Sequence, residues 1–284
     1  MPPELETLEH EVLNKNGLML ARENELSVLK AVRLFGHLRR SEIALAVWPE
    51  SSPSVAYQMA CKTVSRMIRK NLLLPRQNSI GGTSFVLTKK GAALLRAEGY
   101  EANAGYSQSY DGAQFLHRTL GTYYLLEKKR HGYRVFGEYA IQRGWSGVTS
   151  DMFKADFQKL PDGLIFHEPG SLGFREEITP VDWIEVEQAY KSVAEIKKAL
   201  AVLTKRNSID RAGFLALNKL VFVYRTDQNH ELRILQAIKS FLNEHAELSP
   251  DIFTESISMV RCVVRAPMQW ESMSEHSAAE LMKP

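Results

Sequence analysis

Residues 160–167 read LPDGLIFH and residues 181–188 read VDWIEVEQ, and the aliphatic and aromatic content of both stretches predicts β-strands. Side chains alternate along a strand, so Glu185 and Glu187 are expected on one face while the residue between them points into a core. Asp162 stands just before the first strand. If the two strands pair as a hairpin, these three carboxylates converge.

Clustered carboxylates repel one another unless a cation neutralises them. Carboxylate oxygens suit a hard ion such as Mg²⁺ or Mn²⁺, which can activate water and stabilise charge on a phosphate. We therefore expect a metal site made of Asp162, Glu185 and Glu187. Taken separately, a Pro-Asp pair is usually a turn and alternating Glu residues usually face solvent. The second strand is expected to be central in its sheet, where solvated Glu residues would be costly, and this favours the metal site.

Outside the hairpin, the pattern alternates between helix and strand. Helices are expected over residues 115–131, 190–205 and 230–245, and further strands over residues 133–140, 220–224 and 257–265. This order predicts an α/β sheet covered on both faces, in a domain over residues 113–266. Residues 101–112, rich in Gly, Ser, Asn and Tyr, are expected to be a linker, and residues 267–284 a polar, disordered tail.

The first hundred residues form a separate predicted domain, 1–100. Its expected elements are helices over residues 22–35, 42–48 and 54–70, hairpin strands over residues 72–76 and 84–87, and a closing helix over residues 89–97. That order is typical of a winged helix-turn-helix, whose third helix enters the major groove of DNA. The candidate DNA-binding residues are polar or basic: Gln58, Lys62, Ser65, Arg66, Arg69, Lys70, Arg76, Lys89 and Lys90.

Charge is distributed unevenly, although the total of +3 says little about partners. Residues 30–96 carry twelve Lys or Arg and two Glu, a net charge of +10. Residues 101–284 carry 22 basic and 24 acidic residues, a net charge of −2. A basic N-terminal domain beside a near-neutral body favours nucleic-acid binding by the first domain. The alternative is a small basic domain that docks onto another protein.

Composition places the chain among ordinary globular proteins. Its 284 residues, 44% hydrophobic and 24% charged, suggest two domains with real cores and exclude a disordered or collagen-like chain. Two distant cysteines, Cys61 and Cys262, argue against a disulfide framework or a cysteine zinc site. Acidic residues after Met1 do not suit a signal peptide, and no apolar stretch is long enough to span a bilayer. We expect a soluble, cytoplasmic protein.

The strand pair resembles the PD-(D/E)xK nuclease superfamily, with Pro161-Asp162 as the first motif and Glu185-Val186-Glu187 as the second. The family places a further acidic residue before the hairpin, and Glu138 matches that place. The resemblance implies a restriction-endonuclease-like α/β core and metal-dependent cleavage of DNA. One departure is Glu187, where the family usually has Lys. Some restriction endonucleases carry Glu there and remain active, and Lys191 could supply the displaced positive charge.

The whole layout, over about residues 25–225, resembles the replication-relaxation proteins of plasmids and the MobC-type plasmid relaxases among them. The features are the winged helix, a helix with an early His117, a strand ending in Glu138, and the stretches KLPDGLIF and WIEVEQAYKS. That family typically reads Glu-x-Asp on the third strand, so Glu187 is a conservative departure. The resemblance implies nicking at a plasmid origin or element end, with double-stranded DNA and relaxosome or mobilization proteins as partners.

Two other readings remain open. The first is a non-catalytic DNA-binding regulator of replication or transfer with a degenerate nuclease fold, which the Glu in place of Lys favours. The second is a transposase subunit that pairs a nuclease fold with a winged helix, although its nuclease domain usually comes first. A tyrosine nucleophile is not supported, because the eight His residues show no three-His cluster. His117 is kept only as a candidate that supports the site or contacts DNA.

Overall fold

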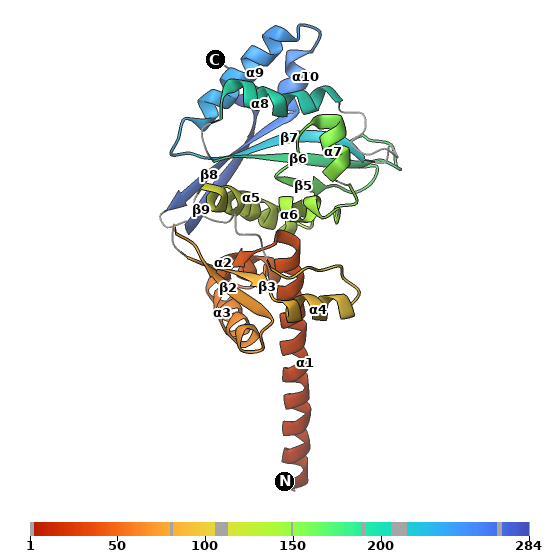
Figure 1. The fold of residues 1–284 in the computed structure, drawn as a ribbon, viewed down its shortest axis with the longest axis vertical. Helices are drawn as coiled ribbons and strands as arrows, with labels where there is room; N and C mark the ends of the chain where they lie inside the picture. Colours follow the sequence, from red (N-terminus) through yellow and green to blue (C-terminus); the bar gives the residue numbers. More distant parts are fainter. Residues whose placement is uncertain are drawn as a thin grey trace. The chain divides into compact units, whose positions relative to one another are not determined.

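The computed structural model describes residues 3–79, 82–105, 113–148, 150–188, 191–205, 215–265 and 269–283. Contacts divide the chain into two compact units, one of Met1–Gln77 with Gly82–Ser107 and one of Asn78–Gly81 with Gln108–Pro284. Both contain helices and strands, so the protein is mixed α/β (Figure 1). None of the helices in the described ranges combines the length and apolar character that a membrane crossing requires.

The first unit joins four helices to a small sheet. Its elements are α1 (Pro3–Phe35), β1 (Leu38–Arg39), α2 (Arg40–Val47), α3 (Pro53–Arg69), β2 (Leu73–Gln77), β3 (Thr83–Leu87) and α4 (Lys89–Ala97). The antiparallel sheet has the order β1-β3-β2. Pro53 stands in the first turn of α3, where its fixed φ suits a helix, and the Thr88 hydroxyl caps α4 by accepting from the Gly91 amide. The expected helices and hairpin are present, but α1 begins nineteen residues before the expected position 22.

The second unit is built on a six-stranded sheet. Its strands are β4 (Arg134–Gly137), β5 (Gly163–Phe166), β6 (Thr179–Glu187), β7 (Leu215–Arg225), β8 (Ile257–Arg265) and β9 (Gln269–Ser277), in that spatial order. The pairs β6–β7 and β7–β8 are parallel, and the other three pairs are antiparallel. The helices are α5 (Ala113–Arg130), α6 (Glu138–Gln142), α7 (Ser150–Phe157), α8 (Val193–Leu200), α9 (His230–Glu244), α10 (Pro250–Glu255) and α11 (Ala278–Leu281), with a 3-10 turn at Ala201–Lys205.

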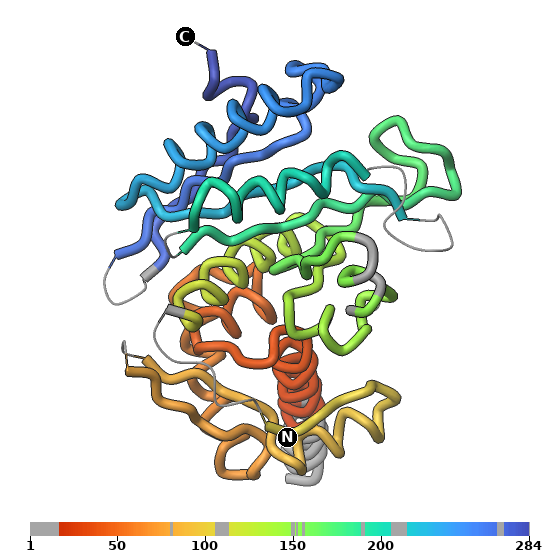
Figure 2. Tube along the Cα trace, turned by 45° about the horizontal axis from the view of Figure 1, so that its top comes forward, coloured from red at the N-terminus to blue at the C-terminus, as the bar shows by residue number. Residues whose placement is uncertain are grey.

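Helices cover both faces of this sheet, as the sequence predicts. The helices α8, α9 and α10 lie on one side and α5 and α6 on the other, in both views (Figures 1 and 2). On the first side, Trp183 of β6 belongs to a core with Leu200 of α8 and Ile238 of α9. On the second side, Gly121 of α5 approaches Val186, since a Cβ at this glycine would lie 3.0 Å from the valine Cγ2. Alternate residues of β6 therefore face different layers.

Two expectations about the second unit are wrong. The strand expected over residues 133–140 ends at Gly137, and Glu138 instead begins α6. The polar tail expected over residues 267–284 contains strand β9, which pairs with β8, and helix α11. β9 is an edge strand with mostly polar side chains, so its composition resembles that of a tail. Residues 101–105 of the expected linker have no regular structure, and its remainder lies outside the described residues.

Close packing of α4 against the start of the hairpin predicts an effect on stability. A Cβ at Gly91 would lie 2.2 Å from the carbonyl oxygen of Leu72, which already accepts the Thr88 amide. We expect Gly91→Ala to lower the free energy of unfolding by about 1–3 kcal/mol, because the backbone must shift. Gly17→Ala is the control, because nothing lies within 4 Å of its added Cβ. Urea denaturation that gives the two variants equal stability would contradict this packing.

Candidate active site

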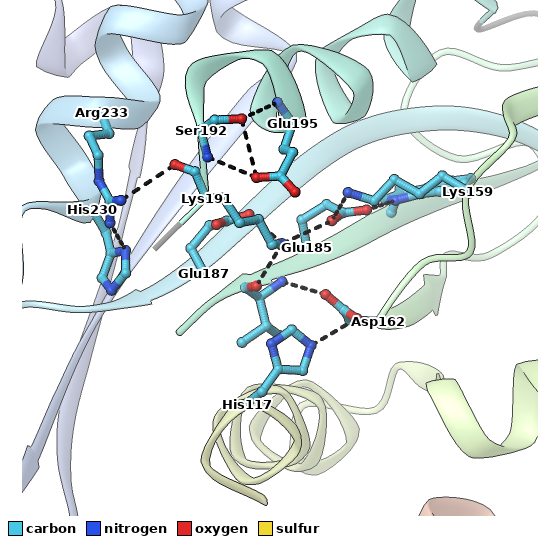
Figure 3. Close-up of polar contacts among 12 residues, drawn as sticks. His117, Lys159, Asp162, Glu185, Glu187, Lys191, Ser192, Glu195, His230 and Arg233 are labelled. Atoms are coloured by element: carbon cyan, nitrogen blue, oxygen red, sulfur yellow. Dashed lines mark hydrogen bonds and ion pairs between the residues drawn. The ribbon is translucent and has the colours of Figure 1, made fainter. Parts of the chain in front are cut away.

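The antiparallel pairing of β5 with β6 brings Asp162 beside the Glu-bearing strand. The Asp162 amide donates to the Ile184 carbonyl at 2.9 Å, which continues the ladder by one residue beyond β5. The Asp162 carboxylate also accepts from the Val186 amide, with Oδ2 2.8 Å from the nitrogen. The predicted hairpin is therefore present, and its backbone orients the aspartate (Figure 3).

Asp162 forms an ion pair with His117 of α5. Its Oδ1 lies 2.9 Å from the histidine Nε2. Burial opposes ionisation of the carboxyl group, but the His117 charge and hydrogen bond outweigh burial and lower the pKa of Asp162 to about 2. Burial also opposes protonation of His117, but the aspartate outweighs it and raises the histidine pKa. The pair consequently favours an aspartate anion facing an imidazolium.

Glu185 is completely buried, and its two oxygens have different partners. Oε1 accepts from the indole Nε1 of Trp183 at 2.7 Å. Oε2 ion-pairs with Lys159, whose Nζ lies 2.6 Å away. Burial raises the pKa of Glu185, the Lys159 charge and hydrogen bond oppose this, and the neighbouring Asp162 anion adds to it. Both oxygens of this buried carboxylate therefore have a close donor.

Lys191 joins the remaining carboxylate to the same cluster. Its Nζ lies 2.8 Å from Oε1 of Glu187, 3.3 Å from the Val186 carbonyl oxygen and 3.9 Å from Oε2 of Glu185. Burial raises the pKa of Glu187 and opposes protonation of Lys191, but the surrounding carboxylates outweigh burial and raise the lysine pKa. The chain is fixed just after Lys191, because Ser192 begins α8 with a capping box.

Glu138 lies beside Asp162 through its backbone, while its side chain is bonded elsewhere. Its amide donates to the Asp162 carbonyl at 3.0 Å. Its carboxylate lies 3.1 Å from the Arg118 guanidinium and accepts from Gln142 at 2.6 Å. Burial raises the pKa of Glu138 despite Arg118. The expected acid is thus at the edge of the site, bound to an arginine.

Lys159 and Arg118 are site residues that sequence reasoning missed, and His117 has a closer role than expected. Lys159 stands three residues before Asp162, in the same KLPD stretch, so proximity in sequence was an available signal. Its contact with Glu185 depends on where α7 ends and could not be inferred from spacing. His117 and Arg118 come from α5, whose register on the sheet no sequence pattern specifies.

The donors suit a hard divalent cation by their chemistry, since they are carboxylates. Their arrangement is already balanced by protein cations. Across the described part of the chain, no three His, Cys, Asp or Glu side chains are arranged to hold a metal ion. Loading Mg²⁺ or Mn²⁺ at Asp162, Glu185 and Glu187 would require the ammonium groups of Lys159 and Lys191 to move.

The candidate DNA-binding residues of the first unit fall into two groups. Exposed side chains without a described carboxylate partner are Gln58, Lys62, Ser65, Arg69, Arg76, Lys89 and Lys90. By contrast, Arg66 and Lys70 both bind the buried Glu25, with nitrogen–oxygen distances of 2.5 and 2.8 Å. Arg66 was expected to face outward, but it is half-buried, because a carboxylate in the core of the unit needs a cation.

The His117–Asp162 pair predicts a pH-dependent stability. A histidine whose folded-state pKa is raised stabilises the fold fully below its unfolded pKa, and that contribution is lost as pH rises through the folded value. We expect His117→Gln to cost about 1.5–3 kcal/mol at pH 5.5 and less at pH 9, by urea denaturation. The exposed His245–Glu247 pair supplies the control, His245→Gln, with little change. A His117→Gln effect that grows with pH would contradict the ion pair.

The chain matches no protein-family model, and no curated protein or solved structure matches it significantly. The resemblances noted from the sequence therefore depend on the motif residues themselves. The structure adds that these residues, Asp162, Glu185, Glu187 and Lys191, come together at one end of a hairpin. Function is accordingly inferred from the chemistry of this site.

Proposed function

We propose that this protein is a metal-dependent DNA endonuclease of the nicking type, with a PD-(D/E)xK-like second unit and a winged-helix first unit. The observation that carries the proposal is the cluster of Asp162, Glu185, Glu187 and Lys191 on and beside the inner strand β6, in which both glutamates are buried. The motif acids and a lysine are adjacent there in space, although they are spread over thirty residues of sequence.

The energetics of the cluster favour chemistry over stability as its purpose. Removing charges from water is costly, and buried ion pairs are often replaced by apolar groups without loss of stability. Here Glu185 and Glu187 are buried on β6, and the half-buried Asp162 lies beside them. Their pKa values move in opposite directions, downward for Asp162 and upward for Glu185 and Glu187, because their partners differ. Such divergence within one cluster is typical of acid–base sites.

Each residue of the site has a role in this proposal. Asp162 and Glu185 would hold Mg²⁺ or Mn²⁺ together with Glu187, and the bound ion would supply an activated water and charge stabilisation. His117 keeps Asp162 ionised and oriented. Lys191 supplies the positive charge that the motif usually places at position 187, and it can neutralise a phosphate oxygen.

Further residues support the site from its edges. Lys159 shares the neutralising role, because its ammonium faces the same Glu185 oxygen as Lys191. Glu138 links its own backbone to Asp162 and holds Arg118, so its role is to position the hairpin rather than to touch the ion.

The first unit supports recognition of double-stranded DNA. Its helix α3 presents Gln58, Lys62, Ser65 and Arg69 to solvent, and the β2–β3 hairpin adds Arg76. Helix order, hairpin and basic surface are those of a winged helix, whose third helix lies in the major groove. We infer that it binds a plasmid origin or element end in the cytoplasm, together with relaxosome or mobilization proteins.

A second function is favoured by one specific observation. Lys159 and Lys191 already neutralise Glu185 and Glu187, and Glu replaces the usual motif lysine at position 187. A cluster balanced in this way can serve as a purely structural element of a degenerate nuclease fold. The protein would then be a non-catalytic DNA-binding regulator of replication or transfer. Tight, salt-sensitive DNA binding without cleavage is its signature.

Cleavage is tested on supercoiled plasmid that carries the cognate origin, incubated with the full chain and Mg²⁺ or Mn²⁺. We expect nicked circles, and a rate at least about 100-fold lower for Asp162→Asn, because the isosteric amide removes a ligand charge. Asp251→Asn, at an exposed position of α10, is the matched control and should nick normally. Equal nicking by Asp162→Asn would refute the proposed site. DNA binding without nicking by the wild type would establish the second function.

DNA binding by the first unit is tested with the same duplex at several salt concentrations. We expect Lys62→Ala and Arg69→Ala each to weaken binding and to reduce the slope of log K against log salt by about one, if each contacts a phosphate. Arg22→Ala is the control, because this exposed residue of α1 pairs with Glu98 and lies outside the predicted surface. A loss of affinity equal in all three variants would argue against α3 as the contact helix.

A further inference from the structure

Several buried polar atoms lack a hydrogen bond at one edge of the second unit's sheet. They are Oε1 of Gln188, Nε of Arg225 and Nε2 of His230. Glu187 pairs with Tyr224 in the parallel β6–β7 ladder. Gln188 and Arg225 are the next residues of the two chains, so they lie side by side at the carboxyl ends of these strands. Buried polar groups are almost always satisfied, so a local group of unsatisfied ones indicates a missing partner.

The missing partner of His230 must accept a hydrogen bond. A guanidinium nitrogen of Arg233 lies 2.8 Å from Nδ1 of His230, and because arginine can only donate, Nδ1 is the acceptor (Figure 3). The proton of the neutral imidazole is then on Nε2. Burial, with added repulsion from Arg233, lowers the pKa of His230 and keeps the ring neutral. His230 is 1% exposed, and this N–H donor has no partner among the described protein groups.

Arg225 supplies a second unsatisfied donor nearby. One of its terminal nitrogens pairs with Asp227, while its Nε is buried without a partner. The Arg225 side chain is one-fifth exposed, so a ligand can approach it from solvent. The unsatisfied atom of Gln188 is an acceptor, Oε1, whereas those of Arg225 and His230 are donors. Rotation of the Gln188 amide by 180° would present its NH2 donor instead.

The surroundings of these donors are positive. Asn229 leaves the amino end of α9 without a side-chain cap, so the helix dipole adds positive potential there. Arg233 donates toward the Lys191 carbonyl, and both their charges act on His230. The acidic groups are engaged, because Asp227 pairs with Arg225 and Glu231 accepts two bonds from Arg261.

We propose that this edge, formed by Arg225, His230 and the amino end of α9, binds a phosphate group. A phosphate group carries several acceptor oxygens, which is the chemistry that the two orphaned donors lack, and its charge suits the helix terminus. The group can belong to a free phosphate or to a DNA backbone. The site extends beyond the proposed nuclease function and stands whether or not the carboxylate cluster cleaves DNA.

Calorimetric titration of the full chain with inorganic phosphate, and duplex DNA binding at several salt concentrations, test the site. If the site binds free phosphate, Arg225→Gln should weaken phosphate binding about tenfold, because one charge-assisted hydrogen bond is lost. In a DNA-backbone site, the same variant should reduce the salt slope of DNA binding by about one. Arg175→Gln, an exposed arginine paired with Glu177, is the matched control for both. If Arg225→Gln changes neither measurement, the proposal is wrong.

A measurement on the wild type covers the case in which a variant fails to fold. In long-range proton–nitrogen spectra, the His230 Nε2–H signal should move on addition of inorganic phosphate or of duplex DNA. His230→Gln identifies the signal by its loss. No movement with either ligand would overturn the phosphate site. Because nicking is not the readout, this result is separate from success or failure of the endonuclease proposal.

Discussion

The hydrogen bond from the Val186 amide to the Asp162 carboxylate is the contact on which the rest of the site depends. It exists because β5 and β6 pair antiparallel, with the Asp162 amide donating to Ile184. Glu185 and Glu187 share a face because side chains alternate along β6, and the β5–β6 register places Asp162 beside them. Every other charged group of the site is arranged around that register.

Electrostatic balance is the second constraint on the site. Three carboxylates, Asp162, Glu185 and Glu187, face three cations, His117, Lys159 and Lys191. Pairing with these cations offsets part of the cost of removing the carboxylates from water. The same balance means that a divalent ion can enter only as lysine ammonium groups withdraw. In the proposed endonuclease, ammonium groups released in this way could neutralise the phosphate of the substrate.

Sequence patterns predicted the secondary structure well where the hydrophobic pattern was clear or a capping residue marked the end of an element. The bounds of α4 and β8 agree with expectation, since Thr88 caps the first and an apolar run defines the second. Glu138 was wrongly assigned to a strand, because the strand-like residues of the stretch 133–140 continue past the position where α6 begins. β9 was missed because an edge strand need not be apolar. Contacts of Lys159 and His117 depend on helix packing, which one sequence does not specify.

The central claim is that the β5–β6 cluster is a cation site whose lysines yield to a divalent ion. A crystal structure of the full chain soaked with Mn²⁺, with anomalous data, tests it most directly. The account predicts an anomalous peak bonded by Asp162 and Glu185, with at least one of the two lysines turned away. No peak at these carboxylates, with Lys159 and Lys191 still paired to Glu185 and Glu187, would contradict it.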